Sequence, residues 1–228
     1  MRRLRPAIPL VLLLAAVPAL EAQETRTPAP SDPQRFEALY RARLDSARMR
    51  FTAADVAFMR DMIHHHAQAV TMSRMAPGNG AGSAVQVLAA RIINAQRDEI
   101  AIMQTWLRDR KQAVPEVHEM DGTLMVHSSG GDGHAGHAGH LMPGMLSDAE
   151  LAQLRAARGA AFDRLFLELM IRHHKGAVSM VETLFATDGA GQDEAVFKFA
   201  SDVQVDQRTE VQRMEQMLAT LGGTPGGR

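Results

Sequence analysis

Cysteine is absent from the 228-residue chain, and aromatic side chains make up only 4% of it. Without thiols no disulfide can hold the fold, and a soft metal ion would have to be bound by imidazole or thioether groups. The lack of cysteine also excludes a lipoprotein anchor and covalently attached c-type haem. Few aromatic residues, abundant Ala, Leu, Met, Gln, Arg and Glu, and no sustained period-two alternation predict an all-α protein.

An excess of charge of either sign is missing as well. The chain has 25 Lys and Arg against 26 Asp and Glu, which gives a formal net charge of −1. A protein without a basic surplus cannot neutralise a row of phosphates, so nucleic acid is excluded as a partner class.

The N-terminus has the pattern of a secretory signal. Arg2, Arg3 and Arg5 precede an apolar segment at residues 8–20, and small residues follow it. This segment is shorter than the roughly 20 apolar residues that a membrane span needs. We therefore expect residues 1–22 to be cleaved, and the protein to be periplasmic or secreted with no membrane association afterwards. Cleavage removes three Arg and one Glu, which moves the formal net charge from −1 to −3.

Caps and helix breakers divide the rest of the chain. Thr52 with Asp55, and Ser147 with Glu150, are N-capping pairs that open helical segments. Residues 115–146, rich in Gly, His, Ser and Met, are interpreted as a linker. The predicted layout is a disordered lead-in (23–33), a short helix and a helical hairpin (34–114), the linker, and a second short helix and hairpin (147–221), with residues 34–221 forming one domain.

The two halves are an internal repeat. At an offset of 108 residues, Phe58, Met62, Ile63, His65, His66, Ala69, Val70 and Met72 match Phe166, Met170, Ile171, His173, His174, Ala177, Val178 and Met180. At an offset of 111, Gln96, Arg97, Glu99, Met103 and Leu107 match Gln207, Arg208, Glu210, Met214 and Leu218. Because neither hairpin alone can cover its apolar face, the repeat predicts that the two pack into a four-helix bundle.

Methionine and histidine share one face of the repeated helix. On a helical wheel Met62, His65 and His66 fall within roughly 100° of one another, with Met72 at the edge of that arc. His64 falls on the opposite side, and we assign it to solvent because Arg172 replaces it in the second copy. The histidine triplet is therefore expected to supply two ligands.

The helices that follow each cassette carry a second set of candidates. Met103 and Met214 could complete a site, although methionine at helical spacing is more often core filling. The candidate metal ligands are Met62, His65, His66, Met72, Met103, Met170, His173, His174, Met180 and Met214. Residues that could hydrogen-bond the free imidazole nitrogens are Gln96, Glu99, Gln207 and Glu210.

Ligand chemistry selects the metal. Zinc gains little from thioether, whereas soft Cu(I) accepts thioether and imidazole together, and Ag(I) should bind by the same logic. A di-iron carboxylate bundle needs Glu-x-x-His spacing, and residue 171, three after Glu168, is Ile171. In the linker, His134, His137, His140, Met142 and Met145 are either a metal-scavenging tract or a solvated spacer, and the sequence leaves both open.

These motifs resemble the domain-of-unknown-function 305 (DUF305) family, whose signature is a Met-x-x-His-His helix followed by a helix with Gln, Glu, Met and a terminal Trp-Leu. Residues 58–75 and 96–107 fit this pattern, and residues 166–180 and 207–218 fit it again, with Met217 in place of the tryptophan. Residues 142–148 are similar to the family's middle section. The resemblance implies a ferritin-like four-helix bundle and, for members of the CopM type, periplasmic copper binding.

The sequence thus predicts an exported, non-enzymatic protein that binds copper, as Cu(I) or with Ag(I) in its place, for copper resistance or periplasmic copper handling. No activated nucleophile, acid–base pair or phosphate cradle is recognisable. The partners expected are metal ions and another periplasmic copper protein. Two alternatives stay open, namely a b-type haem electron carrier with Met and His axial ligands, and a structural or interaction bundle without metal.

Overall fold

The computed structural model describes residues 32–48, 50–120, 122–128 and 141–222. The chain divides between residues 40 and 41 into two units. The described part of the first unit is the exposed start of helix α1 (Asp32–Arg48), which begins two residues before the predicted start at residue 34. The predicted signal segment, residues 1–22, and the rest of the lead-in lie outside the described residues.

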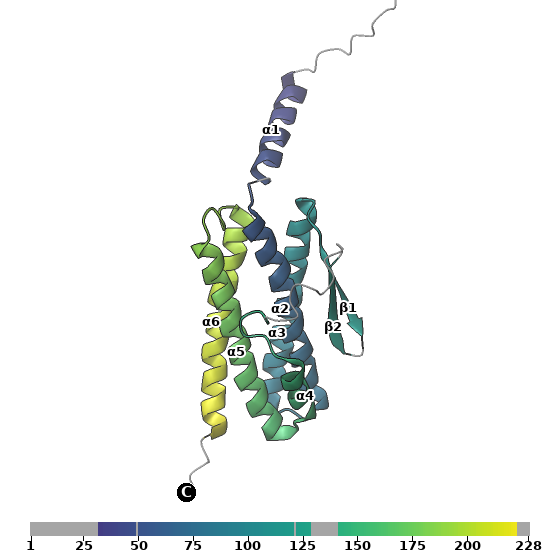
Figure 1. Ribbon diagram of the computed structural model, residues 1–228, viewed down its shortest axis with the longest axis vertical. Coiled ribbons are helices and arrows are strands. Elements are labelled where there is room, and N and C mark those ends of the chain that lie inside the picture. The colour runs from purple at the N-terminus through teal and green to yellow at the C-terminus, as the bar shows by residue number, and fades with distance from the viewer. Residues whose placement is uncertain (1–31, 49, 121, 129–140, 223–228) are drawn as a thin grey trace, which may run out of the picture. The chain divides into compact units, whose positions relative to one another are not determined.

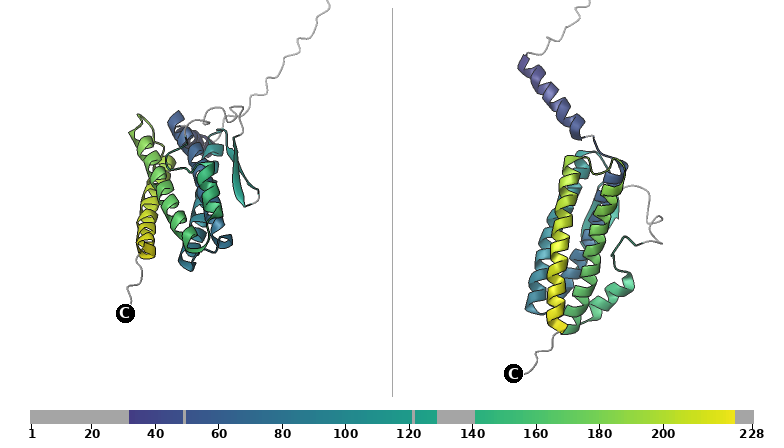
Figure 2. Two further views of the ribbon diagram at one scale, coloured as in Figure 1. Left: turned by 60° about the horizontal axis from the view of Figure 1, so that its bottom comes forward. Right: turned by 90° about the vertical axis from the view of Figure 1, so that its left-hand side faces the viewer.

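Four long helices dominate the second unit: α2 (Ala53–Gly78), α3 (Ser83–Asp109), α5 (Gly159–Ala186) and α6 (Glu194–Gly222). They lie side by side, with α2 and α3 forming one hairpin, α5 and α6 the other, and α2 packed along α5 (Figures 1 and 2). The short helix α4 (Asp148–Ala156) precedes α5. The predicted helical framework of two hairpins is confirmed. No described helix is both long enough and apolar enough to cross a membrane.

The predicted caps are present. Thr52 N donates to Asp55 Oδ2 at 2.8 Å while Asp55 N donates to Thr52 Oγ1 at 3.2 Å, which is a complete capping box at the start of α2. Ser147 and Glu150 form the same box at the start of α4. Each box satisfies two backbone groups that would otherwise lack a partner and so fixes where the helix begins.

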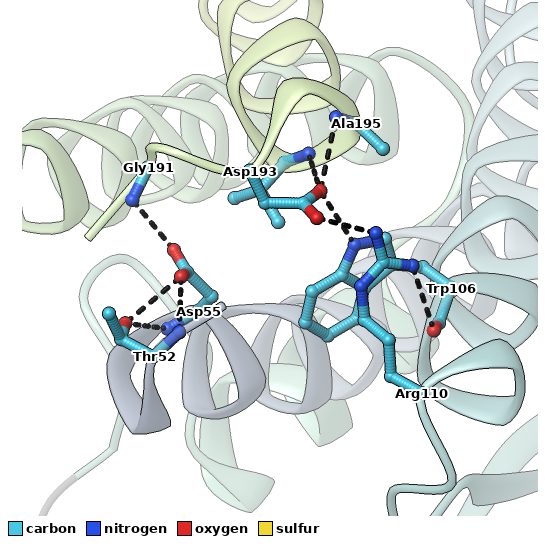
Figure 3. A network of polar contacts seen from close by, with 8 residues as sticks. Thr52, Asp55, Trp106, Arg110, Gly191, Asp193 and Ala195 are labelled. Carbon is cyan, nitrogen blue, oxygen red and sulfur yellow. Dashed lines mark hydrogen bonds and ion pairs between the residues drawn. The ribbon is translucent and has the colours of Figure 1, made fainter. Parts of the chain in front are cut away.

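Aspartates at equivalent repeat positions tie each hairpin to the loop of the other. The buried Asp55 at the start of α2 accepts from Gly191 N at 2.7 Å through Oδ1 (Figure 3), and Gly191 lies in the α5–α6 loop. Asp163, 108 residues later at the start of α5, accepts from Gly82 N in the α2–α3 loop at 3.0 and 3.1 Å. The hairpins are therefore fixed to one another at both ends.

A buried ion pair closes the end of the bundle near Asp55. Arg110 Nη2 donates to Asp193 Oδ2 at 2.5 Å, and Trp106 Nε1 donates to Asp193 Oδ1 at 3.1 Å (Figure 3). The same Oδ1 atom accepts from Ala195 N and Val196 N, so Asp193 also caps the start of α6. This charge is fully paired and hydrogen-bonded, as a buried carboxylate must be.

The first half of the segment predicted as a linker contains two strands, which the sequence did not predict. Strands β1 (Pro115–Met120) and β2 (Thr123–Ser128) form an antiparallel hairpin, and Gly122 between them has φ +76°. The hairpin flanks α2 and α3 on the side away from α5 and α6 (Figure 1). Its alternation is hidden in the sequence because Met125, which reads as apolar, points outward between the inward-facing Leu124 and Val126.

The core consists of two apolar clusters, one toward each end of the bundle. One contains Phe58, Met62, Met103, Trp106 and Val203, and the other contains Met72, Ile92, Phe166, Met170 and Met214. Both draw on α2, α3, α5 and α6, and buried polar residues lie near the midpoints of these helices, namely His65, Gln96, His173 and Gln207. A layer of polar side chains therefore separates the two clusters.

Candidate functional site

The polar layer is built from both repeats in the same way. The cassette helices α2 and α5 contribute four histidines, and the partner helices α3 and α6 contribute one glutamine and one glutamate each. Its members are His65, His66, His173, His174, Gln96, Glu99, Gln207 and Glu210. All four histidines have no exposed surface, and both glutamines are buried. Four imidazoles buried between apolar clusters are costly to keep without partners.

The two repeats meet at this layer through their first histidines. The ring centres of His65 and His173 lie 3.8 Å apart, with 41° between the ring planes. Within each cassette the neighbouring ring is further away, at 6.5 Å from His65 to His66 and 6.2 Å from His173 to His174. The central pair is therefore in direct ring contact, and one further imidazole flanks it on each repeat.

The outer histidine of each repeat contacts a glutamate of its partner helix. His174 Nε2 donates to Glu210 Oε2 in a 2.8 Å hydrogen bond. His66 Nε2 is equally close to Glu99 Oε2, at 2.8 Å, but this contact lacks hydrogen-bond alignment. The two glutamates thus lie beside the imidazoles at equivalent positions, and only Glu210 holds its histidine in a defined orientation. The matching Gln96 and Gln207 keep amide oxygens without a protein partner.

A segment of the predicted linker covers the central pair. Residues 141–146, named the strap here, run toward α4 (Figure 1), and the Pro143 carbonyl accepts from His65 Nε2 at 3.0 Å. Gln68 of α2 holds the same segment by two bonds, from its Nε2 to the Leu146 carbonyl at 3.0 Å and from Leu146 N to its Oε1 at 2.7 Å. The strap is therefore latched to α2 directly over the histidine layer.

The strap reaches α5 only because two glycines face each other. A Cβ on Gly176 would lie 2.0 Å from the Pro143 carbonyl oxygen, and one on Gly144 would lie 2.5 Å from the Arg172 carbonyl oxygen. Gly144 also has φ +78°, a conformation that glycine adopts without strain. Sequence reasoning missed Gln68, Pro143 and Gly176. A glycine in the interior of a predicted helix was the available signal, since it weakens a helix unless backbone must approach closely.

Burial keeps the central pair uncharged. Desolvation, followed by the neighbouring His66, lowers the pKa of His65 from 6.5 to about 3, against the opposing effect of the Pro143 carbonyl. Desolvation, followed by His65, lowers the pKa of His173 well below its ordinary value. A neutral imidazole has one nitrogen lone pair to offer, so both rings are in the form that binds a metal ion.

Several of these nitrogens have no protein partner. The Nδ1 atoms of all four histidines are buried and unpartnered, as is His173 Nε2. In His65 and His174 the Nε2 proton is engaged by an acceptor, which leaves the lone pair on Nδ1. Such an arrangement, with one ring nitrogen held and the other free, is typical of metal-ligating histidines. Within the described residues no three His, Asp or Glu are arranged to hold an ion.

The predicted methionine ligands lie in the two clusters that border the layer. Met62 and Met103 are in one cluster, with the half-buried Met180 against it, and Met72, Met170 and Met214 are in the other. Each cluster thus receives methionines from α2, α5 and one partner helix. On the strap, Met142 and Met145 are half-buried. The remaining linker candidates, His134, His137 and His140, lie outside the described residues.

The two positions assigned to the solvent face differ in exposure. Arg172 is exposed and pairs with Glu150 at 2.6 Å, whereas its counterpart His64 is half-buried. Two surface hollows, of about 180 and 380 Å³, have no residue of the histidine layer in their linings. The smaller is lined by residues of α3 and the β-hairpin, and the larger by residues of α5 and α6.

The chain is similar to known proteins over most of its length. The sequence pattern of the family described as Domain of unknown function (DUF305) matches residues 55–218. A DUF305 fragment from Deinococcus radiodurans is 30% identical, with a TM-score of 0.58, over 75% of this chain and 98% of that one. A DUF305 protein from Streptomyces coelicolor is 28% identical, with a TM-score of 0.58, over 77% and 98%. No curated protein matches.

A third similar protein has been solved with a bound metal ion. CopM in its Cu(I)-bound form is 27% identical, with a TM-score of 0.53, over 74% of this chain and 98% of CopM. CopM is also solved in Cu(II)-bound and Ag-bound forms.

Proposed function

This chain belongs to the DUF305 family, and on that premise we propose that it is an exported protein that binds copper in the histidine layer of its bundle. The ion is Cu(I), with Ag(I) accepted in its place. The role is copper resistance or copper handling in the periplasm, and no catalytic step is assigned to the site. The partners proposed are metal ions and another periplasmic copper protein that delivers or receives them.

The observation that carries the proposal is the set of unpartnered Nδ1 atoms on His65, His66, His173 and His174. A buried polar atom without a partner costs about 1–3 kcal/mol, so a layer of several is unfavourable unless something else occupies it. A cation bound in the layer would satisfy those lone pairs that reach it. The lowered pKa of His65 and His173 supports the same reading, because a neutral imidazole does not repel the ion.

The choice of copper rests on donor chemistry and on a relative. Imidazoles that border clusters containing Met62, Met103, Met170 and Met214 form a soft donor set, which suits Cu(I) and Ag(I) better than zinc. CopM, which is similar to this chain, has been solved with Cu(I), Cu(II) and Ag. Export to the periplasm is proposed from the N-terminal pattern of basic and apolar residues.

A competition assay tests the proposal. The mature chain and its His65→Ala/His173→Ala variant are titrated anaerobically with a chromophoric Cu(I) chelator. We expect the double variant to lose most of its competing strength, because it lacks both central imidazoles. His64→Ala is the matched control, since it changes the same triplet on the opposite side of the helix. Equal Cu(I) affinity in the chain and the double variant, with both folded by circular dichroism, would overturn the proposal.

The same samples separate the two alternatives. A ligand that binds the folded state raises its melting temperature by mass action, so a metal-free module predicts melting curves that added Cu(I) and chelators leave unchanged. A b-type haem carrier predicts a Soret band after purification with haem supply. His65 and His173, with ring centres 3.8 Å apart, leave no space for a macrocycle between them, so the Soret band tests the remaining case of one Met and one His axial ligand.

A further inference from the structure

The β-hairpin sorts its side chains by chemistry. The inward face carries Val117, Leu124 and Val126, which pack against the bundle. The outward face, named the hairpin face here, carries Glu116, His118, Met120, Met125 and His127, all of them exposed. Two imidazoles, two thioethers and a carboxylate thus share one solvent-facing surface, although nothing in the packing of the bundle requires them.

The strand register brings three of these groups together. His118 is directly opposite Met125, and His127 is opposite Glu116. Directly opposite residues on one face have Cβ atoms about 5 Å apart, and diagonal neighbours remain within reach of long side chains. His118 and His127 are such a diagonal pair, and their ring centres lie 5.7 Å apart.

That separation suits one ion held by both rings. A metal ion bonded to an imidazole nitrogen lies about 2 Å from that atom and hence roughly 3 Å from the ring centre, so two rings that share an ion can be up to roughly 6 Å apart. The His118 and His127 rings at 5.7 Å meet this limit without movement of the strands. His118 Nε2 is 3.2 Å from Glu116 Oε2, which leaves Nδ1 as the ligating atom.

The platform under these side chains is fixed to the bundle. Leu124 N donates to Thr71 Oγ1 of α2 at 3.0 Å, and Gln104 Nε2 of α3 donates to the Pro115 carbonyl at 2.9 Å. Glu119 pairs with Arg74 of α2 at 2.5 Å. The hairpin is therefore held at both strands, and the backbone that carries His118, Met125 and His127 does not have to order when an ion binds.

We propose that the hairpin face is a second, surface site for a soft monovalent ion, Cu(I) or Ag(I), bound by the His118 and His127 imidazoles and the Met125 thioether. The Met125 thioether, directly opposite His118, completes the ligand set and makes the site selective for soft ions. This site shares no residue with the histidine layer and does not depend on the function proposed for that layer.

Silver titration followed by methionine-methyl NMR tests the site. The mature chain, labelled with ¹³C at the methionine methyl groups, carries His65→Gln and His173→Gln to weaken the histidine layer. It also carries His134→Asn, His137→Asn and His140→Asn to remove the linker imidazoles. We expect the Met125 resonance, assigned with Met125→Leu, to shift and saturate at one equivalent of Ag(I). Adding His118→Gln and His127→Gln should weaken binding at least about tenfold.

One control variant and two contrary outcomes complete the test. Asp98→Asn is the control for Glu116→Gln, since it removes an exposed carboxylate of α3, outside the hairpin, while Glu116 contacts His118. We expect the first to leave the Met125 titration unchanged and the second to weaken it. A Met125 signal that does not move at one equivalent of Ag(I), or that moves equally without both histidines, would overturn the proposal. The titration is repeated with the histidine layer intact. If the layer binds no ion, the Met125 titration is unaffected, so the two proposals can fail separately.

Discussion

His65 and His173 occupy the same position in the two repeats, and their ring centres meet 3.8 Å apart in the middle of the bundle. Each is buried completely, and each has its pKa lowered by desolvation. The internal repeat is thus also a spatial one, since the two copies place the same side chain at one shared layer. The proposed copper site belongs to both hairpins at once and requires that they be docked.

The glutamates beside the outer histidines should contribute unequally. Glu210→Ala removes an aligned hydrogen bond to His174, so we expect Cu(I) affinity to fall about 10–100-fold. Glu99→Ala removes a contact of the same length without hydrogen-bond alignment, and its effect should be smaller. Chelator competition on the two variants measures the difference. Equal losses would mean that the alignment of the His174 bond does not matter for binding.

The metal-free protein should lose stability as the pH falls below 6.5. The unfolded chain protonates its histidines near pH 6.5, whereas the folded state keeps His65 neutral down to a pKa of about 3 and His173 neutral well below its ordinary pKa. The unfolded state therefore binds more protons in this window, and the free energy of unfolding falls by up to about 1.4 kcal/mol per pH unit for each group. Urea unfolding between pH 7 and 5 measures the slope.

Between pH 7 and 5, Glu150 and Asp193 do not contribute to this slope of unfolding free energy against pH. Arg172 lowers the pKa of Glu150 to about 2, and the bonds from Arg110 and Trp106 lower the pKa of Asp193 despite its burial. These groups reduce stability only when the pH falls below the ordinary carboxylate range, so above pH 5 they remain ionised. The His65→Gln/His173→Gln variant should show a shallower slope between pH 7 and 5. An unchanged slope would show that other groups cause the pH dependence.

Gly176→Ala should dislodge the strap. The added Cβ would lie 2.0 Å from the Pro143 carbonyl oxygen, which is the acceptor of His65, so strap and helix must separate. We expect a loss of about 1–3 kcal/mol in the free energy of unfolding, as for overpacked cores, and faster hydrogen exchange in residues 141–146. Gly78→Ala is the control, since its Cβ would meet nothing within 4 Å. Similar melting temperatures for the two variants would contradict the close approach.

Asp193→Ala should destabilise the fold without touching the histidine layer. It leaves Arg110 buried without its partner and removes the acceptor of Trp106 and the cap of α6. Breaking one side of a buried ion pair typically costs about 3–5 kcal/mol. Asp188→Ala, at an exposed position of the same loop, should cost little. Chemical unfolding gives the energies, and Cu(I) affinity of the folded fraction should match that of the unmodified chain.

The sequence carried most of the information on the helices. The starts of α2 and α4 were readable, because Thr52 with Asp55 and Ser147 with Glu150 bond within one turn and need no tertiary contact. The hairpin at residues 115–128 was not readable, because an exposed Met125 disguises the alternation of its strand. The hairpin is also held by tertiary hydrogen bonds to Thr71 of α2 and Gln104 of α3, which no local pattern shows.

The Met–His pattern and its duplication were determined by the sequence alone, because helical periodicity places residues on a face whatever that face later contacts. Only the tertiary structure decided which faces meet. It put His65 against His173, divided the methionines between two clusters, and laid the strap over the layer through Gln68 and the Pro143 carbonyl. These contacts join residues far apart in the chain, and their geometry follows from packing two hairpins together, which no local pattern encodes.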